Sequence, residues 1–377
     1  MRIALFSPFL SNNHGTVLQA FALSKVLRDK GHECEYIQSR LINPGVWNRM
    51  KFLLRHPLSV YWLHEYNNKR KKDLKYQFLQ NDDSRYIYEE NQKFCNRYTP
   101  VREGVVAYDD LSSLESQYDM FMVGSDQTWS PNAFYRYSPN YLSFIKNEGK
   151  KASYGSSMGT PNLPHGYLKF IKKRLSSFGS LSCRDRVNVS TLTKILRRKV
   201  THVVDPTLLL NAEVWAQYAE RIEGLPPEFI LCYILGEKKC IIDYAESLGR
   251  KTGYPVYYIQ TRPLDLDQSK IIKRVGAANF LWLIQHCTYM VTDSFHGTIF
   301  SINFNKLFYS FNKHYGNAVD NGRILDILKE FGLEKFFKAD TDTTFEDEAP
   351  DYNRVNGILE DMRASSNTYL DEVLNNH

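Results

Sequence analysis

No stretch of the 377-residue sequence approaches the roughly 20 uncharged apolar residues that a membrane-spanning helix needs. The apolar part of the opening "MRIALFSPFL" is short and has no cleavage site, so we expect a buried first strand and not a signal peptide. The six cysteines form no Cys-x-x-Cys pair and no Cys/His cluster with zinc spacing. We therefore expect reduced thiols in a cytoplasmic protein that needs no metal or cofactor.

A strong net charge is also missing. The value of +6 gives no reason to expect a nucleic-acid partner. Its distribution is uneven, because residues 49–75 carry eight Lys or Arg against two acids, and residues 339–377 carry ten acids against two Arg. The basic segment interleaves leucines and aromatic residues with its charges, which is typical of a helix lying on an anionic membrane surface. A solvated helix that packs its aromatic side chains on its own domain fits equally well.

Short apolar runs alternate with helix-length segments along the chain. A strand at 2–7, a helix closed by Gly31 and a strand at 34–39 form a β-α-β opening, which indicates a parallel sheet with helices on its faces. One longer helix is expected to include 170–186. Further strands are predicted from the remaining apolar runs, at 118–123, 151–154, 229–235, 255–261, 289–294 and 306–311.

The pattern restarts after Pro206, where an Asp-Pro pair marks a domain boundary. We predict an α/β protein with two Rossmann-like domains facing each other across a cleft. The expected units are a first domain at 1–206, a second domain at 207–335 and an acidic tail at 336–377 that ends in an amphipathic helix. A basic helical insertion is expected within the first domain at about 48–96.

Four loops rich in polar and small residues follow predicted strands, at 11–15, 124–129, 154–157 and 292–298. In open α/β sheets, ligands bind outside the carboxyl ends of the strands. Each loop alone has the composition of an ordinary turn. Four of them at strand ends favour a binding site.

The last loop, "TDSFHGT", precedes a predicted helix. Gly297 allows close backbone approach, and the unpaired amides at a helix start favour phosphate or carboxylate. Ser294 and Thr298 add hydroxyl groups, and His296 can donate to a phosphate or transfer a proton. In the alternative interpretation, Ser294 caps the helix and His296 packs against the neighbouring strand.

Two further side chains are candidates for the site. Arg184 in "SCRDR" can bind carboxylate or phosphate bidentately, although arginines are mostly surface residues. Asp126 in "GSDQTW" can act as a base if it is partly buried, or it can simply cap a helix.

These loops, in this order, resemble the polysaccharide pyruvyl transferase family over roughly residues 3–328. The resemblance rests on "NNHGTVLQAFAL", "GSDQTW", "ASYGSSMG", "SCRDR", "VVDPTLLL" and "FLWLIQHCTYMVTDSFHGTIFSINF". It implies a two-domain fold of the GT-B type. It also implies transfer of pyruvate from phosphoenolpyruvate to two hydroxyls of one sugar, which makes a cyclic ketal. In the family, the Arg of S-x-R and the His of H-G lie in the donor site, and these are Arg184 and His296 here.

The resemblance assigns roles to the loops of both halves. Arg184 would neutralise the carboxylate of the donor, the helix opened by Gly297 would hold its phosphate, and His296 would act as acid or phosphate ligand. The first domain would bind the acceptor, a lipid-linked or free saccharide for a capsule or cell surface. The expected acceptor residues are Asn13, Gly15, Ser125 and Asp126, and Asp126 would also accept a hydroxyl proton.

Two positions depart from the family pattern. His14 stands where the first loop commonly has an aromatic residue in N-Y-G, and "GSS" stands where alanines are usual. We expect both departures to affect the choice of acceptor. Two other functions fit the same sequence, namely a GT-B glycosyltransferase that uses a nucleotide sugar, and a saccharide-binding protein without catalysis.

Overall fold

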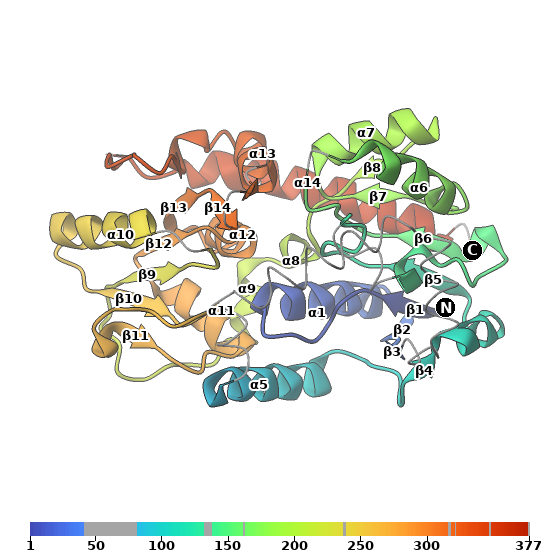
Figure 1. Ribbon diagram of the computed structural model, residues 1–377, viewed down its shortest axis with the longest axis horizontal. Coiled ribbons are helices and arrows are strands. Elements are labelled where there is room, and N and C mark those ends of the chain that lie inside the picture. Colours follow the sequence, from blue (N-terminus) through green and yellow to red (C-terminus); the bar gives the residue numbers. More distant parts are fainter. Residues whose placement is uncertain are drawn as a thin grey trace.

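The protein is described by a computed structural model that covers residues 1–40, 81–131, 138–160, 163–236, 239–315, 318–320, 322–346 and 348–375. Two α/β domains lie side by side, and the C-terminal helix runs across both (Figure 1). No helix within these ranges is long and apolar enough to cross a bilayer. The basic segment at 49–75, for which the sequence predicts membrane contact, lies outside the described residues.

The first domain is built on a parallel sheet with the strand order β2-β1-β5-β6. Every residue of β1 except Arg2 is buried, because helices or loops cover both faces of the sheet. Its elements are β1 (Arg2–Phe6), α1 (His14–Asp29), β2 (Glu33–Tyr36), β3 (Ser39–Arg40), α5 (Asp82–Tyr98), β4 (Val106–Ala107), β5 (Met120–Val123), β6 (Lys151–Ser153), α6 (His165–Leu175), β7 (Ser182–Cys183), α7 (Arg186–Leu196) and β8 (Thr201–His202).

The second domain contains a six-stranded parallel sheet with the order β11-β10-β9-β12-β13-β16. The linker between the domains holds α8 (Pro206–Leu209) and α9 (Ala212–Ala216). The domain and tail elements are β9 (Ile230–Tyr233), α10 (Lys239–Thr252), β10 (Val256–Ile259), β11 (Ile271–Ile272), α11 (Ala277–His286), β12 (Tyr289–Thr292), α12 (Phe295–Asn303), β13 (Leu307–Phe311), β14 (Lys313–Tyr315), β15 (Ala318–Asp320), α13 (Gly322–Phe331), β16 (Phe337–Lys338) and α14 (Tyr352–Asn375).

The strand order of each sheet locates the loops that can bind a ligand. In the first sheet, the chain winds outward in both directions from β1 and β5, and in the second from β9 and β12. Loops after such neighbouring strands diverge and leave room at the carboxyl edge. The segments that open α1, follow β5 and open α12 all leave strands at these two points. Three of the four predicted site loops therefore lie where an open α/β sheet normally binds its ligand, and the fourth, at 154–157, follows the edge strand β6.

The predicted helix over 170–186 is wrong beyond Leu175, where α6 ends. The chain then turns at Gly179 and runs beside β6, with the Ser153 amide donating to the Ser180 carbonyl at 3.1 Å. A new helix, α7, begins only at Arg186. Backbone pairing with β6 therefore overrides the helical periodicity of this stretch, and it places Arg184 in a loop.

Aromatic side chains join the two domains in one hydrophobic core. Phe21 of α1 lies 5.5 Å from Trp215 of the linker, and Trp215 lies 5.1 Å from Phe300 of α12, between ring centroids. These rings belong to one cluster of buried residues that runs from the first sheet to the second. The domains are therefore packed firmly together on this side of their junction.

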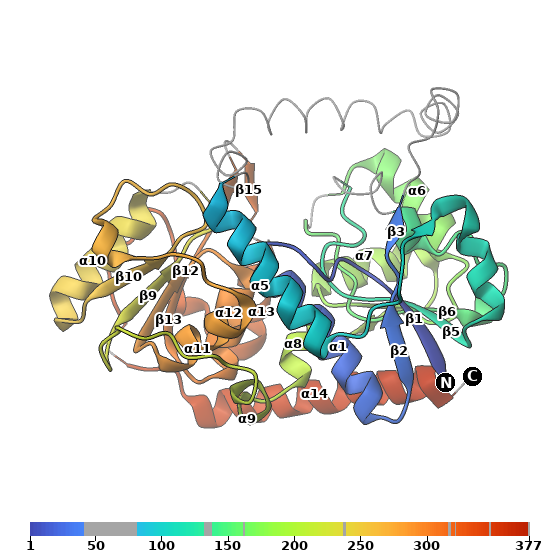
Figure 2. The same ribbon diagram turned by 90° about the horizontal axis from the view of Figure 1, so that it is seen from below.

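Helix α14 fastens the second domain back onto the first. Figure 2 shows it running beneath both domains, with the two chain ends on the same side. The buried Arg363 donates to the Leu208 carbonyl in the linker at 2.6 Å and to Asn303 of α12 at 2.8 Å. Farther along, Tyr369 donates to the Ser153 carbonyl of β6 at 2.7 Å. Helix α14 lies in the segment for which the sequence predicts an amphipathic tail helix, and its contacts tie the two domains together.

Candidate active site

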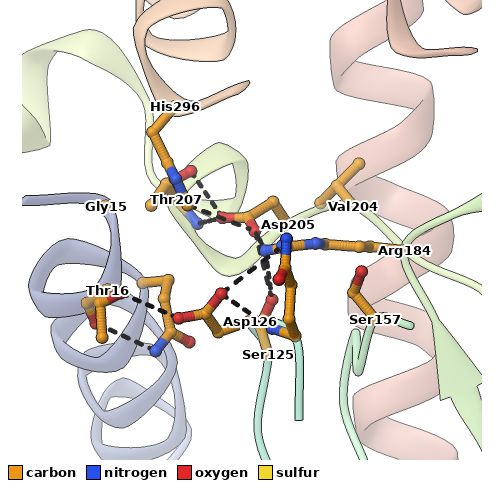
Figure 3. A network of polar contacts seen from close by, with 12 residues as sticks. Gly15, Thr16, Ser125, Asp126, Ser157, Arg184, Val204, Asp205, Thr207 and His296 are labelled. Carbon is orange, nitrogen blue, oxygen red and sulfur yellow. Dashed lines mark hydrogen bonds and ion pairs between the residues drawn. The ribbon is translucent and has the colours of Figure 1, made fainter. Parts of the chain in front are cut away.

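Arg184 lies at the junction of the domains, in the loop between β7 and α7. Its Nη1 donates to Ser125 Oγ at 2.9 Å and to the carboxylate of Asp205, and the residue is only 6% exposed (Figure 3). Its guanidinium carbon lies 4.9 Å from the ring centroid of Phe295, in the second domain. Nε and Nη2 are buried and make no hydrogen bond within the described part of the chain. A guanidinium with two unused nitrogens can donate hydrogen bonds to an anion.

Asp205 holds Arg184 in place. Its Oδ1 caps α8 by accepting from the amide of Thr207 at 3.0 Å and from its hydroxyl at 2.7 Å, and Oδ2 receives Arg184. Burial acts to raise the pKa of Asp205, but Arg184 and the other neighbours outweigh it and hold the pKa below its usual value. The carboxylate is therefore ionised. The Asp-Pro-Thr sequence signals a capped helix start, but nothing in it indicates the partner.

His296 faces the same pair from α12. Its Nε2 lies 3.8 Å from Asp205 Oδ2 and makes no hydrogen bond within the described residues (Figure 3). Its ring packs against Gly15, where an added Cβ would lie 2.0 Å from Nδ1. Burial lowers the pKa of His296 to about 4, with Asp205 opposing this shift and Arg184 adding to it. The imidazole is therefore neutral at neutral pH in the unliganded site.

Asp126 approaches from the loop after β5. Its Oδ2 accepts from the Thr16 hydroxyl at 2.9 Å, and its Oδ1 lies 4.0 Å from Nη2 of Arg184. The backbone of Asp126 has φ = 74°, in the left-handed region that costs energy for a residue with a Cβ. Hydrogen bonds from both neighbouring loops hold this conformation, because Ser157 donates its amide to the Asp126 carbonyl at 3.0 Å. The strained turn presents a carboxylate to the arginine and histidine.

The third predicted loop, at 154–157, supports this turn from behind. The hydroxyl of Ser157 donates to Asp185 at 2.6 Å and accepts from the Gly159 amide at 3.0 Å. Ser157 is fully buried. The "GSS" sequence, expected to affect acceptor choice, therefore contacts the scaffold of the site.

Several predicted site residues serve the local structure. Ser294 caps α12 by accepting from the Gly297 amide at 3.2 Å, as the alternative interpretation held. Thr298 donates to the Ser294 carbonyl at 3.0 Å and lies 2.8 Å from the Ser310 hydroxyl. Gly297 allows α12 to pack on β12, since an added Cβ would lie 2.7 Å from Thr292 Oγ1. The Ser294 cap does not use the amides of Phe295 and His296, which belong to the first helical turn and have no partner within the helix.

The residues predicted to bind the acceptor divide into two groups. Gly15 and Asp126 lie beside His296 and Arg184. Asn13 is exposed and caps α1, with its Oδ1 accepting from the Gly15 amide at 3.0 Å. Ser125 is fully buried, and its hydroxyl bridges Arg184 and Asp205, so it orients the arginine. Within the described ranges, no three His, Cys, Asp or Glu side chains are grouped to hold a metal ion.

His14 contributes to the packing between the domains. Its ring stacks on Phe280 of α11 at 4.8 Å and lies 5.9 Å from Tyr233 of β9. The side chain is 3% exposed. The imidazole thus occupies the aromatic position of the family motif as a flat ring in an aromatic cluster.

A sequence model of the family described as polysaccharide pyruvyl transferase matches residues 13–315. The chain belongs to the polysaccharide pyruvyl transferase family. The matched span runs from the Asn13 cap through β14, so it includes Arg184, Asp205 and His296. The resemblance seen in the sequence motifs is therefore confirmed.

A solved structure with a TM-score above 0.5 supports the GT-B-like fold of this family member. UDP-GlcNAc 2-epimerase from Neisseria meningitidis has a TM-score of 0.51 and 8% identity, with all of both chains covered. The epimerase from Methanocaldococcus jannaschii has a TM-score of 0.48 and 11% identity, with 96% of this chain and 93% of that chain covered. These identities are too low to transfer a substrate. No curated protein sequence matches the chain.

Proposed function

We propose that this protein transfers pyruvate from phosphoenolpyruvate to two hydroxyls of one sugar, forming a cyclic ketal on a capsular or cell-surface saccharide precursor. The observation that carries the proposal is a group of three buried nitrogens. Nε and Nη2 of Arg184 and Nε2 of His296 make no hydrogen bond within the described residues. Buried polar nitrogens without hydrogen bonds are costly, so this group supports a site completed by an anionic ligand.

Each residue has a role in the proposed reaction. Arg184 binds the carboxylate of phosphoenolpyruvate through its unused nitrogens, and the first amides of α12 face the phosphate. Asp126 accepts the proton of the attacking sugar hydroxyl. Asp205 does not contact the substrate in this scheme; it fixes Arg184 and keeps His296 beside it.

The proposed reaction has two steps, addition of the first hydroxyl and displacement of phosphate by the second. An acid protonates the methylene carbon of phosphoenolpyruvate, and the first sugar hydroxyl adds to the central carbon and gives up its proton to the base. The second hydroxyl then attacks the same carbon, the bond to the phosphate oxygen breaks, and the released proton ends on the phosphate. Acid–base assistance of this kind is typically worth about 10²- to 10⁴-fold in rate.

His296 can supply the acid only after the donor binds. In the unliganded site its pKa is lowered to about 4, mainly by burial. A bound phosphate favours the imidazolium, since a nearby opposite charge stabilises the charged form. We therefore expect phosphoenolpyruvate binding at neutral pH to take up a proton. If His296 instead bound the phosphate as a neutral imidazole, it would take up no proton.

Calorimetry in buffers of different ionisation enthalpy measures this proton directly. Wild-type protein should bind phosphoenolpyruvate with net proton uptake, and His296→Ala should lose the uptake. Arg184→Ala should lose binding itself, while Lys194→Ala, an exposed cation on α7, should match the wild type. Uptake that persists in His296→Ala would show that another group receives the proton.

Turnover is tested with phosphoenolpyruvate and a panel of lipid-linked and free saccharides, with mass detection of the ketal. Arg184→Ala and His296→Ala should both abolish product. His296→Ala should melt like the wild type, whereas Arg184→Ala should stay folded but melt at a lower temperature, because it leaves the buried Asp205 carboxylate unpaired. Absence of phosphoenolpyruvate binding by the wild type, together with binding of a nucleoside diphosphate, would instead favour a nucleotide-sugar glycosyltransferase. Saccharide binding alone, unaffected by His296→Ala, would favour a non-catalytic saccharide-binding protein.

A further inference from the structure

A second arginine reaches the candidate site from the other domain. Arg323 is the second residue of α13, and its guanidinium carbon lies 5.6 Å from the ring centroid of Phe295. The guanidinium of Arg184 lies 4.9 Å from the same centroid. Phe295 directly precedes His296 at the start of α12, and both arginines contribute to lowering the pKa of that histidine. Two cations from different domains therefore gather at one helix start.

The loop after β5 orients Arg323. The side-chain oxygen of Gln127 is oriented toward the guanidinium. In this orientation it accepts hydrogen bonds from Nη1 of Arg323 at 3.1 Å and from Nη2 at 2.9 Å. Gly159 leaves space for this side chain, because an added Cβ would lie 2.7 Å from Gln127 Cδ. This contact holds the guanidinium of Arg323 in place beside the loop after β5.

The charge of the donor requires more than Arg184. Phosphoenolpyruvate carries one carboxylate and one phosphate, roughly three negative charges at neutral pH. Arg184 already pairs with Asp205, and Asp126 lies 4.0 Å from its Nη2. These two carboxylates repel an incoming anion. The neutral helix amides supply hydrogen bonds and a partial charge only.

We propose that Arg323 is a donor-binding residue that holds the phosphate of phosphoenolpyruvate, while Arg184 holds the carboxylate. The donor would then lie along Phe295, between an arginine of the first domain and an arginine of the second. Arg323 stands beside the first turn of α12, whose amides face the phosphate. This inference rests on the proposed function and adds the residue that the sequence motifs do not include.

Four variants test the assignment in the full-length protein. Arg323→Gln should weaken phosphoenolpyruvate binding at least tenfold and raise the KM for the donor far more than that for the saccharide. Arg323→Lys should recover part of the affinity, since it keeps the charge but loses the fork of donors. Lys329→Gln removes an exposed cation from the same helix and should change neither constant. Gln127→Ala removes the orienting contact and should have a smaller effect than Arg323→Gln.

Competition by inorganic phosphate and by pyruvate against phosphoenolpyruvate assigns the end of the donor. Arg323→Gln should weaken inhibition by phosphate and leave inhibition by pyruvate unchanged. The opposite pattern would overturn the phosphate assignment. If Gln127→Ala and Arg323→Gln weakened phosphoenolpyruvate binding equally, Arg323 would serve only to hold the loop after β5 in place.

The outcomes also separate this inference from the proposed function. If the wild type binds phosphoenolpyruvate and Arg323→Gln binds it equally well, the role of Arg323 is refuted and the proposed function stands. If the wild type does not bind phosphoenolpyruvate, the proposed function fails and this inference fails with it. Thermal melting of each variant shows whether its fold is intact.

Discussion

His14 offers a sharp test of how burial controls ionisation at the domain junction. It is 3% exposed, and its ring stacks on Phe280 of the second domain. Its Nδ1 makes no hydrogen bond within the described residues. Burial lowers the pKa of His14 from 6.5 to about 3, and no charge in the described part of the chain opposes this shift. The folded protein therefore keeps this imidazole neutral well below the pH at which the unfolded chain protonates it.

Acid should thus destabilise the fold through His14. Between pH 6.5 and the folded pKa, the unfolded state binds about one more proton at this residue than the native state. Each pH unit then costs about 1.36 kcal/mol, so lowering the pH from 6.5 to 5 should remove about 2 kcal/mol of unfolding free energy. The contribution is fully present above pH 6.5 and decreases as the pH falls.

The substitution His14→Phe keeps a flat ring in the aromatic cluster and removes the titrating group. At about pH 8 its unfolding free energy should lie within about 1 kcal/mol of the wild type, because it also removes an unsatisfied buried nitrogen. Urea unfolding at about pH 8 and about pH 5 gives the difference between the two proteins. The exposed His286 provides the control, since His286→Gln should leave the acid dependence unchanged.

The comparison isolates one residue, because the lowered pKa values of His296 and His202 affect both proteins equally. His14→Phe should lose about 2 kcal/mol less stability than the wild type over this range. An acid dependence identical to that of the wild type would refute the reasoning. It would mean that His14 gains a proton in the folded state, through water or movement of the domains.

Two variants in the first loop, Gly15→Ala and Asn13→Ala, test its contact with His296 and its helix cap. Gly15→Ala should reduce transfer about 100-fold with the fold intact, because its Cβ would lie 2.0 Å from Nδ1 of His296. Gly357 has open space around it, so the control Gly357→Ala should remain active. Normal turnover by Gly15→Ala would disprove the contact. Asn13→Ala should lose about 1 kcal/mol with its cap and raise the KM for saccharide more than that for phosphoenolpyruvate. As a control, Asn211→Ala removes the cap of α9 and should affect stability alone. Equal changes in both KM values for Asn13→Ala would place the acceptor elsewhere.

The arrangement of strands and helices could be predicted from the sequence because its signals are local. Apolar runs such as 289–292 and helix ends such as Gly31 act over a few residues, and the structure confirms β12 and the end of α1 near that glycine. Parallel sheets then place the loops after β1, β5 and β12 at the carboxyl edges without further information. Local periodicity failed where a partner strand intervened, as it did beyond Leu175.

The connections within the site depended on tertiary structure. The Asp-Pro pair marks a domain boundary in the sequence, and only the folded chain shows that Asp205 caps α8 and pairs with Arg184. Arg323 and Gln127 meet across the domain junction, far apart in sequence. Such contacts depend on distances between elements of different domains, which the linker, Arg363 and the rest of α14 set by packing.

The sequence by itself determined the α/β class, the loops that face the junction and the residue types available for binding an anion. Only the tertiary structure decided which of those residues act together. It assigned Ser294 and Thr298 to the helix, Ser125 to the support of Arg184, and His296 to the junction of the domains. The physical reason is that helix and strand formation depends on neighbours in sequence, whereas ion pairing and the pKa of a buried group depend on burial and on charges that packing brings within a few ångströms.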